Sequence, residues 1–243
     1  MQNKRSLDPG DSKEMVAARR RFLAAGHYQP IADAVARALL AGLPAAASCL
    51  DAGCGEGYYL RRLAAAAGAG RTLAILGLDI SKWAVLAAAK QDRRPTWVVG
   101  SSANLPVLTG TLDRVLCLFG FPVHGEFARV LKAGGELLQV DAGPGHLREL
   151  REIIYPALKP QRTAAAPTPA GFRHLGTETL GYSFALAGAE PIADLLTMTP
   201  HLYRASAEGR TRAAALSALT LTVDVRLARF ARDVGRPPAR PPI

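Results

Sequence analysis

Short apolar segments alternate with amphipathic helical patterns along the first two thirds of the chain, and this alternation limits the fold most strongly. Apolar residues recur every three or four positions in the helical patterns. The predicted strands span residues 48–52, 73–78, 96–99, 113–119 and 136–141. The helices predicted among them span 58–67, 82–90, 126–131 and 146–158. Regular strand–helix alternation is typical of a doubly wound α/β sheet with mostly parallel strands.

Both ends of the chain extend this pattern. Residues 15–25 and 31–40 read as helices, so we expect residues 1–42 to form a small N-terminal helical cap or lid. Strand patterns at 178–187 and 219–227 flank a helix at 191–198, which predicts an antiparallel end to the same sheet. Residues 43–235 would then form one Rossmann-like α/β domain with seven strands and helices on both faces. We expect a Pro/Ala loop at 160–170 and a disordered tail at 236–243.

Composition narrows the class of protein. No apolar run reaches the roughly 18 residues of a membrane span, and the polar start lacks a signal-peptide core, so we expect a cytoplasmic protein. Cys49, Cys54 and Cys117 have no CxxC spacing, which predicts neither a metal site nor disulfides. The net charge of +10 suits a polyanionic partner such as RNA, although solvated arginines explain it equally well.

A glycine-rich loop follows the first predicted strand and reads Asp51-Ala-Gly53-Cys-Gly55-Glu56-Gly57. Glycines at such a turn let the backbone approach a ligand closely. Two carboxylates, Asp51 and Glu56, would repel a pyrophosphate but suit a sulfonium, an ammonium and ribose hydroxyls. S-adenosylmethionine (SAM) carries all of these groups, so the loop predicts a SAM site.

Polar residues also follow the next two predicted strands. Asp79, followed by Ile80, stands where an acid can accept both ribose hydroxyls, although it can equally cap the next helix. Ser101, Ser102 and Ala103 lie in a polar loop at the expected depth of the adenine edge. Three such features at successive strand ends predict one ligand site along that edge of the sheet.

The sequence resembles the class I SAM-dependent methyltransferases in this loop, and outside it resembles the large-subunit (23S) rRNA guanine-N1 methyltransferases. The closer resemblance covers nearly the whole chain. Its motifs are KRS-x-DPGDS from Lys4, GHYQP (Gly26–Pro30), CGEGYY (Cys54–Tyr59), ARVLKAGG (Ala128–Gly135), GP-x-HL (Gly143–Leu147) and LLTMTP (Leu195–Pro200).

The resemblance implies that Tyr28, Tyr59, Leu60 and His146 contact the cofactor. From the residues alone, Tyr28 can also be a packing aromatic, and His146 can equally be a helix cap. The family also carries an N-terminal zinc module, and this chain begins where that module would end. A second departure is the segment Cys117–Pro122, which replaces the family's Arg-x-Tyr-Ala-Pro and leaves the substrate open.

Methyl transfer to guanine N1 would be helped by a base that accepts the N1 proton, or by a donor near O6 that stabilises an oxyanion. The candidates near the expected edge are Asp141, His124 and His27. Asp141 can also cap a turn, and His124 can be a solvated loop residue. Methyl transfer would convert SAM to S-adenosyl-L-homocysteine.

Three functions stay open at this point. The first is methylation of a guanine in a structured rRNA hairpin, supported by the resemblance and by basic residues at the N-terminus (Lys4, Arg5, Arg19, Arg20 and Arg21). The second is methylation of a small heteroaromatic substrate in an antibiotic biosynthetic or self-resistance pathway, favoured by the apolar segment Phe119–Phe121. The third is a SAM-binding module without activity. Whether the protein is a monomer or a homodimer also stays open.

Overall fold

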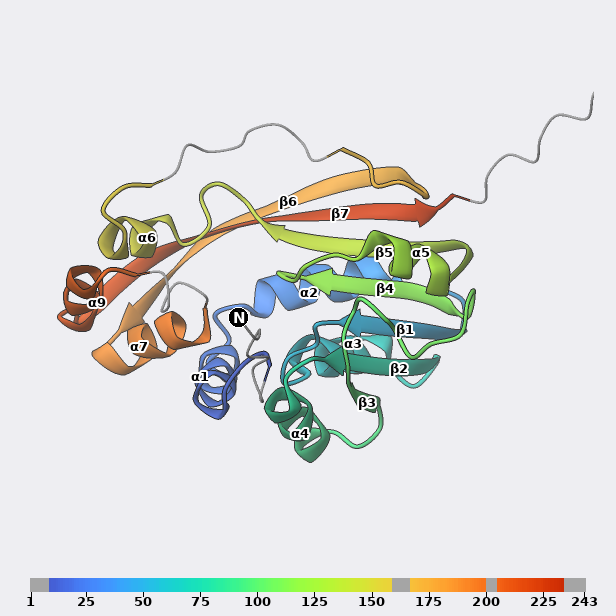
Figure 1. Cartoon of the computed structure of the whole chain (residues 1–243), viewed down its shortest axis with the longest axis horizontal. Coiled ribbons are helices and arrows are strands. Elements are labelled where there is room, and N and C mark those ends of the chain that lie inside the picture. Colours follow the sequence, from blue (N-terminus) through green and yellow to red (C-terminus); the bar gives the residue numbers. More distant parts are fainter. Residues whose placement is uncertain (1–8, 159–166, 200–204, 234–243) are drawn as a thin grey trace, which may run out of the picture.

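The computed structural model describes residues 9–158, 167–199 and 205–233 and confirms the Rossmann-like α/β fold (Figure 1). Its seven-stranded sheet has the order β3-β2-β1-β4-β5-β7-β6. The strands are β1 (Ala46–Ala52), β2 (Thr72–Asp79), β3 (Thr96–Val99), β4 (Leu112–Leu118), β5 (Leu131–Ala142), β6 (Phe172–Ala187) and β7 (Ala218–Arg232). Strands β1 to β5 pair in parallel, whereas β7 pairs antiparallel with β5 and with β6. The predicted antiparallel end of the sheet is therefore confirmed.

Helices precede β1 and lie between successive strands, except between β3 and β4. They are α1 (Lys13–Ala24), α2 (Gln29–Leu40), α3 (Tyr58–Ala67), α4 (Lys82–Gln91), α5 (His124–Val130), α6 (Arg148–Ile154), α7 (Ala189–Met198) and α9 (Ala207–Ala214). Figure 1 shows α1 between α7 and α4, and both neighbours contact it. No helix in the described part of the chain is long and apolar enough to span a membrane.

The central strands are buried on both faces, as expected for parallel strands covered by helices. Neighbouring residues such as Cys49 and Leu50 on β1 belong to two different core clusters, because successive side chains point to opposite faces. One cluster includes Ile31 of α2 and Leu60 of α3, and the other includes Phe127 of α5. The cap helix α2 thus shares its core with the sheet.

Several predicted boundaries were wrong. The helix predicted at 146–158 is only α6, because Leu147 takes a left-handed conformation (φ 49°) immediately before it. Strand β5 follows α5 without a loop and begins at Leu131 instead of residue 136. Strands β6 and β7 are longer than predicted, because they pair antiparallel along their whole length. Helix α9 was not predicted; its N-cap Ser206 accepts the Gly209 N–H at 2.9 Å. The predicted tail at 236–243 lies outside the described residues.

Candidate active site

A cavity of about 590 Å³ opens at the carboxyl ends of β1, β2, β4 and β5. This edge lies where the sheet order reverses direction between β1 and β4, the usual ligand site of open α/β sheets. Ten of the predicted site residues line it: Tyr28, Asp51, Gly53, Gly55, Glu56, Tyr59, Asp79, Ile80, Asp141 and His146. The fold therefore brings together residues from four strand ends and from the N-terminal cap.

The glycine loop is held open toward this cavity. Gly53 and Gly55 adopt positive φ angles of 102° and 54°, which L side chains rarely adopt. A Cβ on Gly53 would meet nothing within 4 Å, so the space beside it is free for a ligand. Gly57 does not line the cavity. It also has a positive φ, and its missing side chain leaves room for the ring of Trp97.

Asp79 organises the loop with both carboxylate oxygens. Oδ2 accepts the Gly55 N–H at 2.9 Å, and Oδ1 accepts the Ser81 N–H at 2.8 Å. Each carboxylate oxygen has a second lone pair that can accept a hydroxyl hydrogen from a ligand. Asp79 therefore fits the predicted role toward a ribose while also fixing the loop.

Asp51 is the second acid of the cavity and is only 1% exposed. Its Oδ1 has no hydrogen-bond partner among the described residues. Burial, with a smaller contribution from Asp79, raises the pKa of Asp51 to about 8. A buried carboxylate without a partner is costly unless a ligand supplies a donor. The amino group of SAM is such a donor, so this orphaned oxygen and the open space beside Gly53 both fit the cofactor.

Glu56 has a different environment from Asp51. Its carboxylate is buried and lies 2.8 Å from Arg61 Nη2, and it also accepts a hydrogen bond from Gln91. The Arg61 guanidinium also donates to the Glu56 carbonyl at 2.6 Å. The side chain of Glu56 thus joins the start of α3 to α4 and has its charge balanced within the protein.

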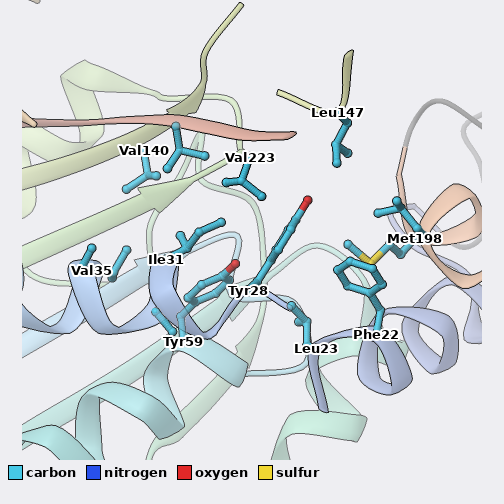
Figure 2. Packing of buried hydrophobic residues seen from close by; sticks show 14 of the residues in the cluster. Phe22, Leu23, Tyr28, Ile31, Val35, Tyr59, Val140, Leu147, Met198 and Val223 are labelled. Atoms are coloured by element: carbon cyan, nitrogen blue, oxygen red, sulfur yellow. The ribbon is translucent and has the colours of Figure 1, made fainter. Parts of the chain in front are cut away.

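An aromatic wall closes the cavity on the side of the cap. Figure 2 shows Tyr28 projecting from the start of α2 toward Leu147, with Tyr59 on one side and Phe22 on the other. The Tyr28 hydroxyl lies 3.2 Å from His146 Nε2, and the Phe22 ring packs edge-on against Tyr28 with centroids 5.1 Å apart. Burial raises the pKa of both tyrosines, so their hydroxyls stay neutral at physiological pH.

Of the three predicted proton acceptors, only Asp141 lines the cavity. His124 lies behind it at the start of α5, and its Nε2 is 3.0 Å from Gln139 Oε1. Gln139 Nε2 in turn donates to Asp141 Oδ2 at 2.7 Å. His27 lies elsewhere and stacks on Phe184 with ring centroids 4.8 Å apart. Burial lowers the pKa of His27, which favours its neutral form.

The structure does not bring the remaining predicted residues to the cavity. Leu60 is fully buried in the core. Ser101, Ser102 and Ala103 form a turn in which Ser101 Oγ accepts the Ala103 N–H at 3.2 Å, and none of the three lines the cavity. Among the described residues, no cluster of His, Cys, Asp or Glu could hold a metal ion.

Several residues at or beside the cavity were not predicted as site residues. Arg19 and Asp11 line the cavity from the N-terminal segment, and Met198 and Thr199 line it from the end of α7. The segments that hold them carried a family resemblance, but no spacing rule linked them to the strand ends. Asp224 on β7 was also missed, and its Oδ2 accepts the Gly145 N–H at 2.8 Å beside His146.

The comparisons with known proteins agree with this site. A family model described as "Methyltransferase domain" matches residues 49–135. YxjB of Bacillus subtilis (strain 168), named as a candidate 23S rRNA (guanine-N(1)-)-methyltransferase, is 31% identical over 87% of this chain and 77% of its own length. A protein of Micromonospora griseorubida with the same activity in its name is 35% identical over 91% of this chain and 80% of its own.

Among solved structures, the YcgJ protein from Bacillus subtilis superposes with a TM-score of 0.52 at 16% identity, covering 84% of this chain and 98% of that chain. At this identity the likeness shows the fold alone. The two relatives match over most of their own length and of this chain. The chain therefore belongs to the family of 23S rRNA guanine-N1 methyltransferases, and it is a SAM-dependent methyltransferase of the class I fold.

Proposed function

We propose that this protein transfers the methyl group of SAM to N1 of a guanine in large-subunit rRNA. The observation that carries the proposal is that one cavity extends from the cofactor acids, Asp51 and Asp79, to an exposed aromatic segment beside Asp141. SAM supplies an electrophilic methyl group on its sulfonium. The residues of this chain would align an acceptor nitrogen with that methyl and accept its proton.

The mouth of the cavity is suited to an unstacked base. Phe119 has a positive φ of 52° and is 39% exposed, and Phe121 is 92% exposed. A phenylalanine left in water forgoes roughly 1.5–3 kcal/mol of burial. Stacking on an RNA base contributes about 1–3 kcal/mol per base, and single-stranded bases are commonly bound in this way. The guanine would be flipped or already unpaired before it enters.

Asp141 is the acceptor that the geometry favours for the N1 proton. Asp141 lines the cavity, and the hydrogen bond from Gln139 orients its carboxylate. In such a transfer the N1 nitrogen would bond to the methyl carbon as the carbon–sulfur bond breaks, and the electron pair of that bond would stay on the sulfur of the product. Asp141 would accept the N1 proton. Alignment of the two reacting atoms is expected to supply most of the rate enhancement.

The excess of basic residues also supports an RNA substrate, although the arginines of α1 differ in their surroundings. The net charge of the chain is +10. On α1, Arg20 is exposed, whereas Arg21 pairs with Asp194 and Arg19 lines the cavity. Lys4 and Arg5 lie outside the described residues. An rRNA substrate would place the enzyme in the cytoplasm.

Methyl transfer from radiolabelled SAM to unmodified large-subunit rRNA tests this proposal. We expect incorporation into the RNA, and we expect Phe121→Ala to raise the KM for RNA while leaving the Kd for SAM unchanged. Leu108→Ala is the matched control, because Leu108 is 79% exposed but does not line the cavity. Incorporation into small heteroaromatic acceptors but not into RNA would contradict the proposal and support the second function.

A further inference from the structure

We infer that Arg19 of α1 is the binding residue for the carboxylate of the cofactor's amino-acid group. The cavity lining contains five acidic residues, namely Asp11, Asp51, Glu56, Asp79 and Asp141. Arg19 is the only lysine or arginine among the described residues that line it. SAM presents two cationic groups and one carboxylate, so a site built for it needs a cation as well as acids.

The position of Arg19 agrees with this role. A Cβ built on Gly55 would lie 3.6 Å from Arg19 Nη1, so the guanidinium lies directly over the glycine loop. Gly55 is also the residue whose N–H binds Asp79 Oδ2, the acid suited to the ribose. A cofactor seated on Asp79 and extending along this loop toward Asp51 would bring its carboxylate beneath Arg19.

Arg19 is held in place by partners from two distant segments. Its Nη1 pairs with Asp11, and its Nη2 donates to the Met198 carbonyl at 2.9 Å. The Asp11 carbonyl accepts the Ser81 hydroxyl at 2.6 Å, which fixes the N-terminal segment against the end of β2. An arginine fork has five N–H donors in fixed directions, so a carboxylate can be bound while the Met198 contact is kept.

The charges of Arg19 and Asp11 also complement the two charged groups of an amino-acid ligand. An α-amino acid carries an ammonium and a carboxylate, which complement a carboxylate and a guanidinium. When the cofactor enters, its carboxylate would share or replace Asp11 as the partner of Arg19. The buried Asp51 oxygen that has no partner would face the ammonium. The N-terminal cap would thereby close on a ligand that carries the complete amino-acid group.

The test compares two ligands that differ only in the carboxylate: SAM and decarboxylated SAM. Their Kd values are measured by calorimetry for the whole chain and for Arg19→Gln. The wild-type protein should prefer SAM by about 10- to 100-fold, the usual effect of a hydrogen bond to a charged group. Arg19→Gln should reduce that preference to about twofold or less, chiefly by lowering the affinity for SAM. The affinity for the decarboxylated ligand should change little.

Two control variants separate carboxylate binding from a structural role of Arg19. Arg20→Gln changes the neighbouring exposed arginine, which does not line the cavity, and should leave both Kd values unchanged. Asp11→Asn removes the ion pair but keeps the guanidinium, so the preference for SAM should persist. The inference would be overturned if Arg19→Gln weakened the binding of both ligands equally, or if this variant kept the full preference for SAM. Binding of neither ligand to the wild-type protein would instead remove the cofactor on which the inference rests.

Discussion

The Tyr28 hydroxyl and His146 Nε2 lie 3.2 Å apart although 118 positions separate them in the sequence. The Asp224 N–H points at His146 Nδ1 at 3.4 Å, which favours the tautomer with the proton on Nε2. Tyr28 then accepts from His146 and keeps its own hydrogen for another acceptor. The contact joins the cap to the loop before α6 and forms one wall of the cavity.

Tyr28→Phe should weaken SAM binding about three- to tenfold with a small change in melting temperature. A phenylalanine fills the same buried space, and a single hydrogen bond contributes about 0.5–1.5 kcal/mol. Calorimetry gives the Kd, and a thermal melt gives the stability. Tyr182→Phe is the matched control, because its hydroxyl donates to the His27 carbonyl and the residue does not line the cavity. An unchanged Kd in Tyr28→Phe would contradict a cofactor role for this hydroxyl.

Asp51 should make SAM binding depend on pH. Its pKa of about 8 in the folded protein lies above the ordinary value of 3.8, so the free protein holds a proton there at pH 7. The ammonium of SAM favours the carboxylate, so binding should release part of a proton, and the affinity should rise by about tenfold or more between pH 6 and 8. Calorimetry in buffers of different ionisation enthalpy measures the released proton.

The same shift has the opposite sign for folding of the free protein. The folded state binds more protons than the unfolded state between about pH 4 and pH 8, so this group's contribution to stability falls as the pH rises through that range. Asp51→Asn should remove the proton release on binding, flatten the pH dependence of stability and lower the affinity for SAM. Proton uptake on binding, or no linkage at all, would show that Asp51 does not face a cation.

Asp79→Ala and Gly55→Val should each abolish measurable SAM binding. The first removes the acid for the ribose and also leaves the Gly55 and Ser81 N–H groups without their acceptor. The second places a β-branched side chain at a φ of 54° beneath Arg19. Asp33→Ala, in an exposed pair with Arg62, is the control. A wild-type Kd in either site variant would contradict the cofactor geometry.

Ligand residues at the ends of the strands could be predicted from the sequence, whereas the residues that other segments bring to the same site could not. Asp51 and Asp79 were predicted as ligand residues because parallel strands bring their carboxyl ends to one edge. Arg19 and Asp224 could not be assigned in this way, since their places depend on tertiary contacts between distant segments. His27 and His124 were predicted near this edge, but neither lines the cavity. The position of a residue in the sequence does not decide which way its side chain points.

Gln139 should act as a positioning residue for Asp141. Gln139→Leu removes the hydrogen bond to Asp141 and the link to His124. We expect kcat to fall about tenfold, equivalent to roughly 1.4 kcal/mol, with an unchanged Kd for SAM and a shifted pH profile of kcat. Asp141→Asn should reduce kcat further. Equal losses in kcat and in SAM affinity would indicate a general structural defect instead.

Gly57 should be needed for packing beside the loop. Its φ is 78°, and an added Cβ would overlap the Trp97 ring. Gly57→Ala should lower the free energy of unfolding by about 2–4 kcal/mol, because backbone strain adds to overpacking. Gly42→Ala shares a positive φ, of 64°, but its Cβ would meet nothing within 4 Å, so it should cost only about 1 kcal/mol. Equal effects in denaturant melts would contradict the packing role of Gly57.

The identity of the modified nucleoside decides whether this protein methylates guanine N1 in rRNA. Unmodified large-subunit rRNA is incubated with the protein and SAM, digested to nucleosides and analysed by mass spectrometry, with the position mapped by reverse-transcription stops. We expect 1-methylguanosine at a single position, and none with Asp79→Ala. A methyl group on another atom or base, or no methylation of RNA by a protein that binds SAM, would contradict this expectation.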